Sequence, residues 1–133
     1  MSDKPFRYVI VGSGNISRTY VQAIDRSPGI ELAAIVSRSG RRVDNAPADL
    51  PVFPSLEAVD VPFDAVILCT PNGLHHQGAR DAARLGKHVL TEKVLEISRE
   101  NMGAMIRDCE EAGVKLAVSY QRRMSPENQT LKR

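Results

Sequence analysis

A glycine-rich turn close to the amino end is the first place where the sequence offers chemistry. An apolar run at residues 6–11 leads into the turn, and a helical pattern follows at once. This order presents main-chain amides and a helix N-terminus to a phosphate. Gly12 allows a tight turn, Gly14 lets a pyrophosphate approach the backbone, and Ser17 is the third small residue of the pattern. The residues predicted to bind a dinucleotide here are Gly12, Ser13, Gly14, Asn15 and Ile16.

A single glycine pattern also arises by chance in loops, so the residues after the second predicted strand add weight. NAD-binding proteins place an acidic residue there, on the ribose 2′-hydroxyl. Here Ser37 and Arg38 occupy the place, and no carboxylate lies between Leu32 and Val43. A hydroxyl and a guanidinium suit a 2′-phosphate, which arginine binds through two hydrogen bonds. We therefore expect NADP as the cofactor in preference to NAD; the alternative is a solvated surface arginine.

Polar residues also follow the other predicted strands. They form three groups: Thr70-Pro71-Asn72, Glu92-Lys93 and Tyr120-Gln121-Arg122-Arg123. Ligands bind outside the carboxyl ends of the strands in an open parallel sheet. With the glycine turn and Ser37-Arg38-Ser39, five strand ends carry such residues, which predicts one binding site at that edge of the sheet.

Strand and helix patterns alternate along the chain, and the strand patterns are largely continuous apolar runs. Such runs are typical of strands that are buried on both faces of a parallel sheet. The expected strands are residues 6–11, 31–36, 52–53, 65–69, 88–91 and 115–119. The β-α-β alternation with short links predicts an α/β fold, a Rossmann-type doubly wound parallel sheet in a single domain.

Three helices are expected between these strands. The second is rich in small residues and ends at Gly86, and the third begins after Ser98 and ends at Gly113, both good capping residues. The residues expected on the apolar faces are Ile16, Tyr20, Ala23 and Ile24 in the first helix and Met102, Met105, Ile106 and Cys109 in the third.

The end of the sequence predicts a further helix. Ser125 and Pro126 form a good helix start, yet only about two turns remain before Arg133, and so short a helix is marginal alone. We expect a dinucleotide-binding domain at residues 1–121. Residues 122–133 are expected to form a connector and the start of a helix leading to a second, α+β domain that this sequence does not contain.

Two longer motifs resemble the amino-terminal half of a known family, the Gfo/Idh/MocA oxidoreductases, which include glucose-fructose oxidoreductase and inositol dehydrogenase. The similarity lies in Cys69-Thr70-Pro71-Asn72-Gly73-Leu74-His75, an alanine-rich helix, and Gly86-Lys87-His88-Val89-Leu90-Thr91-Glu92-Lys93. It runs from the glycine turn to Pro126. One motif differs, because the family's Glu-Lys-Pro is here Glu92-Lys93-Val94, and proline would fix the loop backbone beside the lysine.

The resemblance implies hydride transfer between a nicotinamide and a hydroxyl or carbonyl carbon of a sugar- or cyclitol-like substrate. It implies that Lys93 is catalytic, with its ammonium stabilising charge on the substrate oxygen, and that Glu92 contacts the cofactor near the nicotinamide ribose. The other cofactor contacts that it implies are Thr70, Pro71, Asn72, His75 and Arg122.

These residues also have structural interpretations. Asn72 is a good helix N-cap, Glu92 and Lys93 suit a salt-bridged surface loop, and Arg122 suits a basic connector.

Three classes of function remain to be weighed. The first is an NAD(P)-dependent oxidoreductase whose acid or base, a histidine in the family, would lie in the following domain, so that this chain alone binds dinucleotide and turns over little. The second is a non-catalytic dinucleotide-binding or sensing protein, which Val94 favours. The third, a methyltransferase, needs an acid after the second strand, and a P-loop kinase is excluded because no Gly-Lys-Ser/Thr follows the glycines.

Composition limits the partners. A net charge of +2, with three Phe, three Tyr and no Trp, gives no signature of nucleic-acid binding. Cys69 and Cys109 form no CxxC pair, and with three histidines no metal site is expected; His76 is expected to be exposed. No apolar run has membrane-spanning length. We expect a cytoplasmic protein with a polyol or sugar as its partner and no nucleic acid or membrane; a homo-oligomer is left open.

Overall fold

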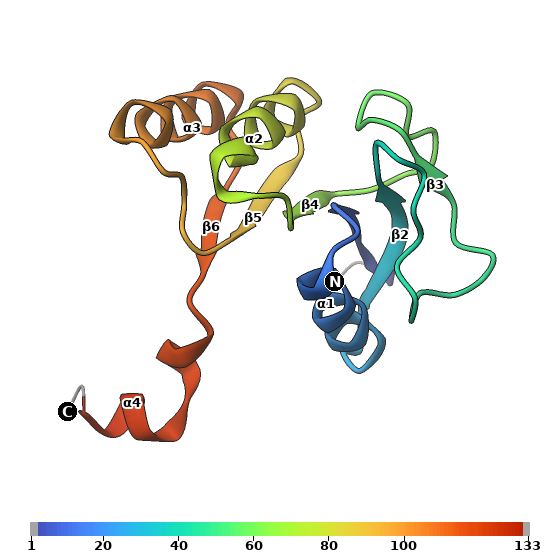
Figure 1. The fold of residues 1–133 in the computed structure, drawn as a ribbon, viewed down its shortest axis with the longest axis horizontal. Helices are drawn as coiled ribbons and strands as arrows, with labels where there is room; N and C mark the ends of the chain where they lie inside the picture. The colour runs from blue at the N-terminus through green and yellow to red at the C-terminus, as the bar shows by residue number, and fades with distance from the viewer. Residues whose placement is uncertain (1–2, 132–133) are drawn as a thin grey trace.

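The structure, a computed structural model, describes residues 3–131, and within them six parallel strands form one sheet (Figure 1). The strands are β1 (Phe6–Val11), β2 (Ile30–Val36), β3 (Val52–Phe53), β4 (Ala65–Leu68), β5 (His88–Glu92) and β6 (Leu116–Ser119). Their order is β3-β2-β1-β4-β5-β6, so the chain moves from β1 toward one edge and from β4 toward the other. This confirms the predicted doubly wound sheet, with its switch point between β1 and β4.

The central strands form because their apolar sequences can be buried on both faces. Ile10 of β1 pairs with Ile35 of β2 and Ile67 of β4, and none of the three is more than 2% exposed. The predicted strands are confirmed to within one residue at each end. Since all of them run in the same direction, the loops after β1, β2, β4 and β5 leave from the same edge of the sheet.

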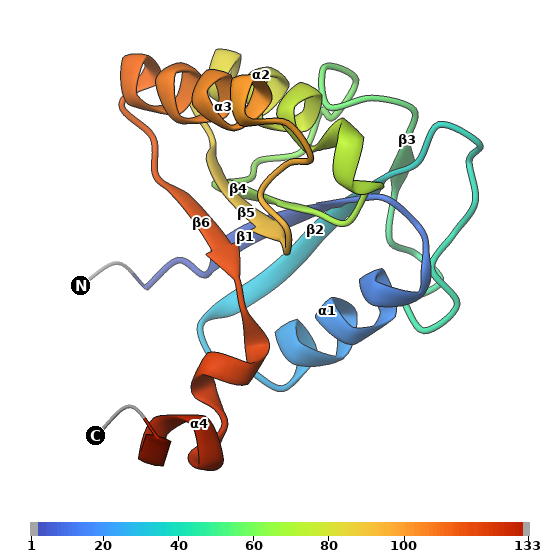
Figure 2. The same ribbon diagram turned by 60° about the vertical axis from the view of Figure 1, so that its left-hand side comes forward.

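Helices cover the two faces unequally. One face carries α1 (Asn15–Asp25), and the other carries α2 (His75–Arg84) and α3 (Arg99–Ala112) (Figure 2). The segment between β3 and β4 packs through Leu56 and Phe63 into the core of the α2 and α3 face. Each helix begins after the carboxyl end of a strand, so all three N-termini lie toward the predicted site.

The buried stripe of α1 differs from the sequence pattern. Ser17, Val21 and Ile24 are buried against the sheet, whereas Ala23 is exposed. The spacing of the buried residues is that of one helix face, and that face passes through Val21. The prediction that Ala23 faces the core is therefore wrong. Alanine is so small that it is found on either face of a helix, so its apolar character alone does not show which face it occupies.

The ends of α3 confirm the predicted capping residues. Ser98 Oγ accepts a hydrogen bond from the Asn101 amide at 3.0 Å, and Gly113 ends the helix in the left-handed conformation, with φ of 70°. Met105 is fully buried as predicted, but Ile106 is 44% exposed. The apolar pattern of α3 is therefore wider than the stripe that actually packs on the sheet.

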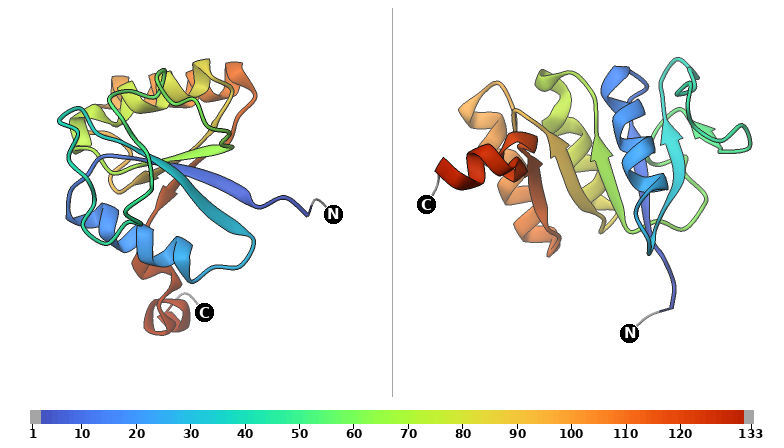
Figure 3. Two further views of the ribbon diagram at one scale, coloured as in Figure 1. Left: turned by 90° about the vertical axis from the view of Figure 1, so that its right-hand side faces the viewer. Right: turned by 90° about the horizontal axis from the view of Figure 1, so that it is seen from below.

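The chain leaves the sheet after β6. The 3₁₀ turn η2 (Gln121–Met124) and the short helix α4 (Pro126–Leu131) lie on the α1 side of the sheet (Figure 3). Ser125 Oγ accepts a hydrogen bond from the Asn128 amide at 3.4 Å, as the predicted helix start requires. No residue of η2 or α4 is buried in the described part of the chain. The domain boundary after residue 121 stays a prediction.

Replacing Gly12 by alanine is expected to destabilise the fold. The added Cβ would lie 2.9 Å from the Cys69 carbonyl oxygen, on a backbone whose φ of +116° side chains rarely adopt. Strain and overpacking together should lower the free energy of unfolding by about 2–4 kcal/mol. Urea denaturation followed by circular dichroism measures the loss.

Gly14→Ala is the matched control, because its Cβ would meet nothing within 4 Å and its φ of −81° is ordinary. Its cost should stay below about 1 kcal/mol, the difference between glycine and alanine at an N-cap. Equal losses in the two variants would contradict the close contact between the turn and β4.

Candidate functional site

The glycine turn is tied to both neighbouring strands of β1. The Gly12 amide donates to the Val36 carbonyl of β2 at 2.9 Å, and the Cys69 amide, after β4, donates to the Val11 carbonyl at 2.8 Å. The Cys69 carbonyl then lies so close that no Cβ fits on residue 12. The position of the turn is therefore set by backbone contacts on both sides.

The N-terminus of α1 is open to a ligand. Gly14 is its N-cap and makes no side-chain capping hydrogen bond, and the first turn holds no acidic residue. A Cβ on Gly14 would meet nothing within 4 Å, and Ser17 Oγ donates to the Gly12 carbonyl at 3.0 Å. First-turn amides lack acceptors within a helix and carry partial positive charge. The predicted residues Gly12, Ser13, Gly14, Asn15 and Ile16 thus form one cradle that fits a phosphate.

Three serine hydroxyls join this turn to the end of β2. Ser37 Oγ lies 3.3 Å from Ser13 Oγ and 3.4 Å from Ser39 Oγ. Ser37 is buried, whereas Arg38 is exposed, and the described residues give its guanidinium no hydrogen-bond or ion-pair partner. Hydroxyls beside an unpaired arginine suit an oxyanion. The sequence placed Ser39 in this strand-end group but predicted no cofactor contact for it.

A second arginine of the same loop has a structural role instead. Arg42 Nη2 donates to the carbonyls of Pro47, Ala48 and Leu50 at 3.1, 3.0 and 2.6 Å. These bonds close the segment between β2 and β3. Arg42 is therefore occupied, in contrast to Arg38.

A cleft of about 320 Å³ opens beside the hydroxyls, at the carboxyl edge of the sheet. Its lining includes Gly12, Arg38, Thr70, Pro71 and Leu74. Thr70 Oγ1 is buried and has no hydrogen-bond partner among the described residues, so a polar group is left there for a ligand to satisfy. The structure thus brings residues after β1, β2 and β4 together, as the sequence predicts.

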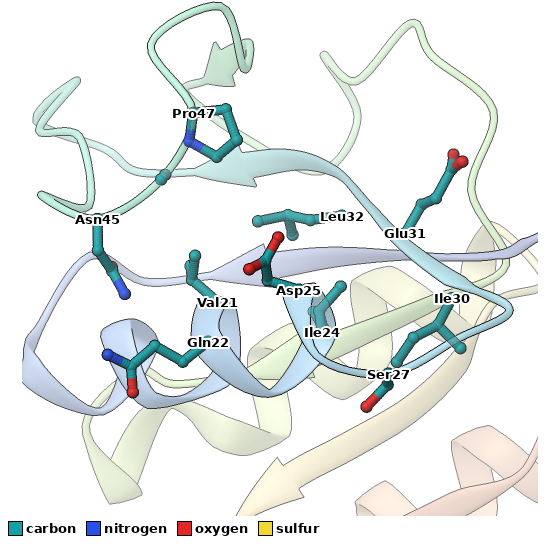
Figure 4. Close-up of a pocket in the computed structure, with 11 residues that line it drawn as sticks. Val21, Gln22, Ile24, Asp25, Ser27, Ile30, Glu31, Leu32, Asn45 and Pro47 are labelled. Atoms are coloured by element: carbon teal, nitrogen blue, oxygen red, sulfur yellow. The ribbon is translucent and has the colours of Figure 1, made fainter.

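A larger cleft, of about 540 Å³, lies away from this edge (Figure 4). Val21 and Asp25 of α1 line one side of it, and Asn45 and Pro47 from the loop after β2 line the other. It extends to Ile30, at the amino end of β2. Because ligands of this fold bind at the carboxyl ends of the strands, the smaller cleft is the candidate site.

Asn72 does not cap α2. The chain passes from Pro71 into a 3₁₀ turn, η1 (Asn72–Leu74), and α2 begins only at His75, with no side-chain capping bond. The structural interpretation of Asn72 as an N-cap is therefore wrong, because the extra turn moves the helix start three residues along the chain.

His75 lies inside the protein and does not face the cleft. Its side chain is fully buried, with Nε2 2.9 Å from the Thr70 carbonyl oxygen and Nδ1 2.9 Å from the Val94 carbonyl oxygen. The structure corrects its predicted contact with the cofactor, since its ring has no exposed surface. It joins the loop after β4 to the loop after β5 and so positions both.

Lys93 is exposed directly after β5, and its ammonium has no hydrogen-bond or ion-pair partner among residues 3–131. The peptide bond between Lys93 and Val94 is cis. The carbonyls of Val94 and Leu95 both lie within 3.2 Å of the His75 ring. The loop that carries Lys93 is therefore fixed by hydrogen bonds although it lacks the expected proline.

Glu96 fixes the same loop from its other side. Its Oε2 accepts from the His76 amide at 3.0 Å and from His76 Nδ1 at 2.7 Å, and its Oε1 accepts from the Ile97 amide at 2.7 Å. Burial raises the pKa of this carboxyl, but the hydrogen bonds from Ile97 and His76 outweigh it and lower the pKa below its ordinary value. The expectation that His76 is exposed is wrong, because Glu96 folds back onto the start of α2 and the His76 side chain is only 20% exposed.

Glu92, at the end of β5, is held by Tyr20 and Gln121, two contacts that the sequence did not predict. Its Oε1 accepts from Tyr20 Oη of α1 at 2.5 Å and from Gln121 Nε2, after β6, at 3.1 Å. Burial first, and then the hydrogen bond to Glu92, raise the pKa of Tyr20 far above its ordinary value. The pairs are 72 and 29 residues apart in the chain, so no local pattern could have found them.

Arg122 is not brought to the cleft. It is exposed in η2, its carbonyl accepts from Ser125 Oγ at 3.0 Å, and within the described chain its guanidinium has no partner. Its segment leads away from the sheet (Figure 3). Its contact with a cofactor stays a prediction.

The two cysteines are buried free thiols. Burial raises the pKa of Cys69 to about 12, a hydrogen bond with Ser17 opposes this, and the charge of Glu92 adds to it. Such thiols are not reactive nucleophiles. Between residues 3 and 131 no group of three His, Cys, Asp or Glu side chains is placed to hold a metal, and no helix there is long and apolar enough to cross a bilayer.

Comparison with known proteins gives a consistent match. The family model described as "Oxidoreductase family, NAD-binding Rossmann fold" (GFO_IDH_MocA) matches residues 6–120. D-xylose 1-dehydrogenase (NADP(+)) 2 from Haloferax volcanii is 37% identical over 123 residues, covering 88% of this chain and 38% of that protein. 1,5-Anhydro-D-fructose reductase from Ensifer adhaerens is 32% identical over 119 residues, covering 86% of this chain and 36% of that protein.

A solved structure matches almost the whole chain. The WlbA dehydrogenase from Bordetella pertussis, in complex with NADH and UDP-GlcNAcA, has a TM-score of 0.90 at 33% identity, covering 97% of this chain and 41% of that one. The chain therefore spans about two fifths of the length of these relatives.

The Glu96 contacts predict a pH-dependent contribution to stability. A carboxyl whose pKa is lower in the folded than in the unfolded state stabilises the fold above its unfolded pKa, about 4.3, and the contribution is lost as the pH falls through the folded value. Glu96→Gln should therefore lower the free energy of unfolding at pH 7 and make it less dependent on pH below about 4.3 than in the wild type. Urea denaturation between pH 3 and 7 compares the two proteins.

Glu100→Gln, which removes an exposed carboxylate from the first turn of α3, is the control and should leave the acid limb unchanged. Parallel pH profiles of wild type and Glu96→Gln would show that Glu96 does not hold the loop through its charge.

Proposed function

Because the chain belongs to the Gfo/Idh/MocA family of oxidoreductases, we propose that it forms the cofactor-binding part of an NADP-dependent dehydrogenase or reductase. One observation carries the proposal. The glycine turn, the open N-terminus of α1 and the polar ends of β2, β4 and β5 meet at one edge of the sheet. A dinucleotide needs this combination, since its pyrophosphate lies on the helix N-terminus and its two nucleosides extend to either side.

The proposed preference for NADP rests on the end of β2. Ser13, Ser37 and Ser39 supply hydroxyls there, and Arg38 supplies a positive charge that no protein group neutralises in the described chain. A 2′-phosphate matches both features, whereas the ribose 2′-hydroxyl of NAD is ordinarily bound by a carboxylate, which this loop lacks. One relative carries NADP(+) in its name, and one solved neighbour was crystallised with NADH, so the choice depends on this chain's own residues.

The proposed chemistry is hydride transfer to or from a hydroxyl or carbonyl carbon of a sugar- or cyclitol-like substrate. The nicotinamide, when bound, supplies or accepts the hydride. Lys93 is proposed to act on the substrate oxygen, because its ammonium is exposed at the carboxyl edge and is not engaged by other described residues. His75 and Glu96 hold its loop in place, and an ammonium placed in this way stabilises negative charge as it develops.

A non-catalytic dinucleotide-binding protein is the second candidate, and Val94 is the observation that favours it. The hydrogen bonds to His75 and Glu96 weaken this argument, since the loop is fixed without proline. The two candidates share the cofactor and differ in turnover.

The direct test is titration of the purified chain with NADPH, NADH and S-adenosylmethionine, followed by nicotinamide fluorescence or calorimetry. We expect saturable binding of NADPH, weaker binding of NADH and none of S-adenosylmethionine. Absence of binding by both nicotinamide cofactors would overturn the proposal.

In the same titration, Arg38→Ala should weaken NADPH about 10–100-fold, because a charge-assisted hydrogen bond contributes about 1.5–3 kcal/mol. NADH should weaken less than about two-fold, since it has no 2′-phosphate to lose. The control is Arg41→Ala, a neighbouring exposed arginine. Equal losses of NADPH and NADH in Arg38→Ala would refute the assignment.

Lys93→Met tests the catalytic role. It removes the ammonium from an exposed side chain, so the fold and the affinity for NADPH should be retained. On the full-length gene product, with a panel of sugars and cyclitols, kcat should fall about 10²–10³-fold, as for the loss of one stabilising donor. Unchanged turnover would discard this role, and absence of turnover in the wild type would favour the non-catalytic candidate.

A further inference from the structure

We propose that the Glu92 carboxylate makes this site bind the oxidised nicotinamide cofactor in preference to the reduced one. The inference rests on the proposed function, and it concerns the charge of the site rather than its shape. The oxidised nicotinamide ring carries a positive charge that the reduced ring lacks, so a fixed negative charge nearby favours the oxidised form.

The direction of the bound dinucleotide follows from the fold. The pyrophosphate cradle lies after β1, and the hydroxyls and Arg38 that suit the 2′-phosphate lie after β2. The adenosine half therefore lies toward β2, and the other half must extend to the opposite side, across the ends of β4 and β5. Glu92 is the last residue of β5 and is therefore the carboxylate on the nicotinamide side.

Within residues 3–131 the Glu92 carboxylate forms no ion pair. The neighbouring Lys93 is exposed and, in the described chain, makes no bond to it. Its two contacts, Tyr20 Oη and Gln121 Nε2, are neutral donors that orient Oε1 and leave the net charge in place.

The field of this carboxylate is weakly screened by water. Glu92 is only 8% exposed, and the groups around it include Tyr20, the Cys69 thiol and Ser119. Its negative charge adds to the burial that raises the pKa values of Tyr20 and Cys69. A charge that acts on Tyr20 of α1 and on Cys69 after β4 also acts on a nicotinamide ring bound at this edge of the sheet.

The measured quantity is the ratio of the dissociation constant of NADPH to that of NADP+, obtained by calorimetric titration of the whole chain. Glu92→Gln keeps the shape and accepts the Tyr20 hydrogen bond but removes the charge. We expect the ratio to fall about ten-fold, as for the loss of one nearby unit charge under partial screening.

A second variant cancels the same charge without altering the buried residue. Gln121 is exposed, so Gln121→Lys is tolerated and places an ammonium beside Glu92. The ratio should again fall several-fold. Glu92→Asp keeps the charge and should keep most of the wild-type ratio, and Glu100→Gln, on the exposed start of α3, should leave it unchanged.

Each outcome decides the inference. A ratio within two-fold of the wild type in both Glu92→Gln and Gln121→Lys would overturn it, and so would a loss in Glu92→Asp as large as that in Glu92→Gln, since geometry rather than charge would then be responsible. Failure of the wild type to bind either cofactor would instead overturn the proposed function.

Discussion

The arrangement of the site depends on the missing side chain of Gly12. Residue 12 has φ of +116° and lies against the Cys69 carbonyl at a distance where a Cβ does not fit. This contact sets how closely the turn after β1 approaches the end of β4 and directs the first turn of α1 outward. The amides of the turn, the hydroxyls of the β2 end and the cleft beside Thr70 then fall at one edge. A larger residue at position 12 would push the turn away from the end of β4 and so separate these groups.

The other half of the site is organised by buried polar groups. The loop after β5 has no regular structure and an exposed lysine, yet His75 holds it from the α2 side and Glu96 ties it to the start of α2. Glu92 in turn is held by Tyr20 of α1. Buried polar groups of this kind are expensive unless every member is paired, and these are paired. Their hydrogen bonds explain how the backbone that follows Lys93 is held without proline next to the lysine.

Much of this could be predicted from the sequence, because the signals are local. Continuous apolar runs identified the strands, Ser98 and Gly113 identified the ends of α3, and the polar residues after each strand identified the edge. Parallel strand direction alone then places those residues together. The resemblance to the Gfo/Idh/MocA family is confirmed by the family match over residues 6–120.

The contacts that sequence reasoning missed join residues far apart in the chain. The sequence pattern places Tyr20 on an apolar helix face. Only the fold shows that its hydroxyl contacts Glu92, 72 residues away in the chain. His75 matches a functional motif, and only its burial shows that it supports the loops. Ala23 and Ile106 were placed by residue type, whereas helix packing selects a narrower stripe. The periodicity of apolar residues predicts a helix or strand, but the hydrogen-bond partner of a polar atom depends on the tertiary structure.

Arg38 takes no part in the hydrogen bonds and ion pairs that hold the described chain together. Its side chain is exposed and, in the described chain, unpaired, whereas Arg42, four residues on, closes a loop through three carbonyls. The residue proposed to bind the 2′-phosphate is thus separate from those that hold the fold together. Replacing Arg38 should change the free energy of unfolding little. This matters because folded proteins are only marginally stable. A substitution at residue 38 is therefore expected to change the proposed coenzyme preference at little cost in the stability of the fold.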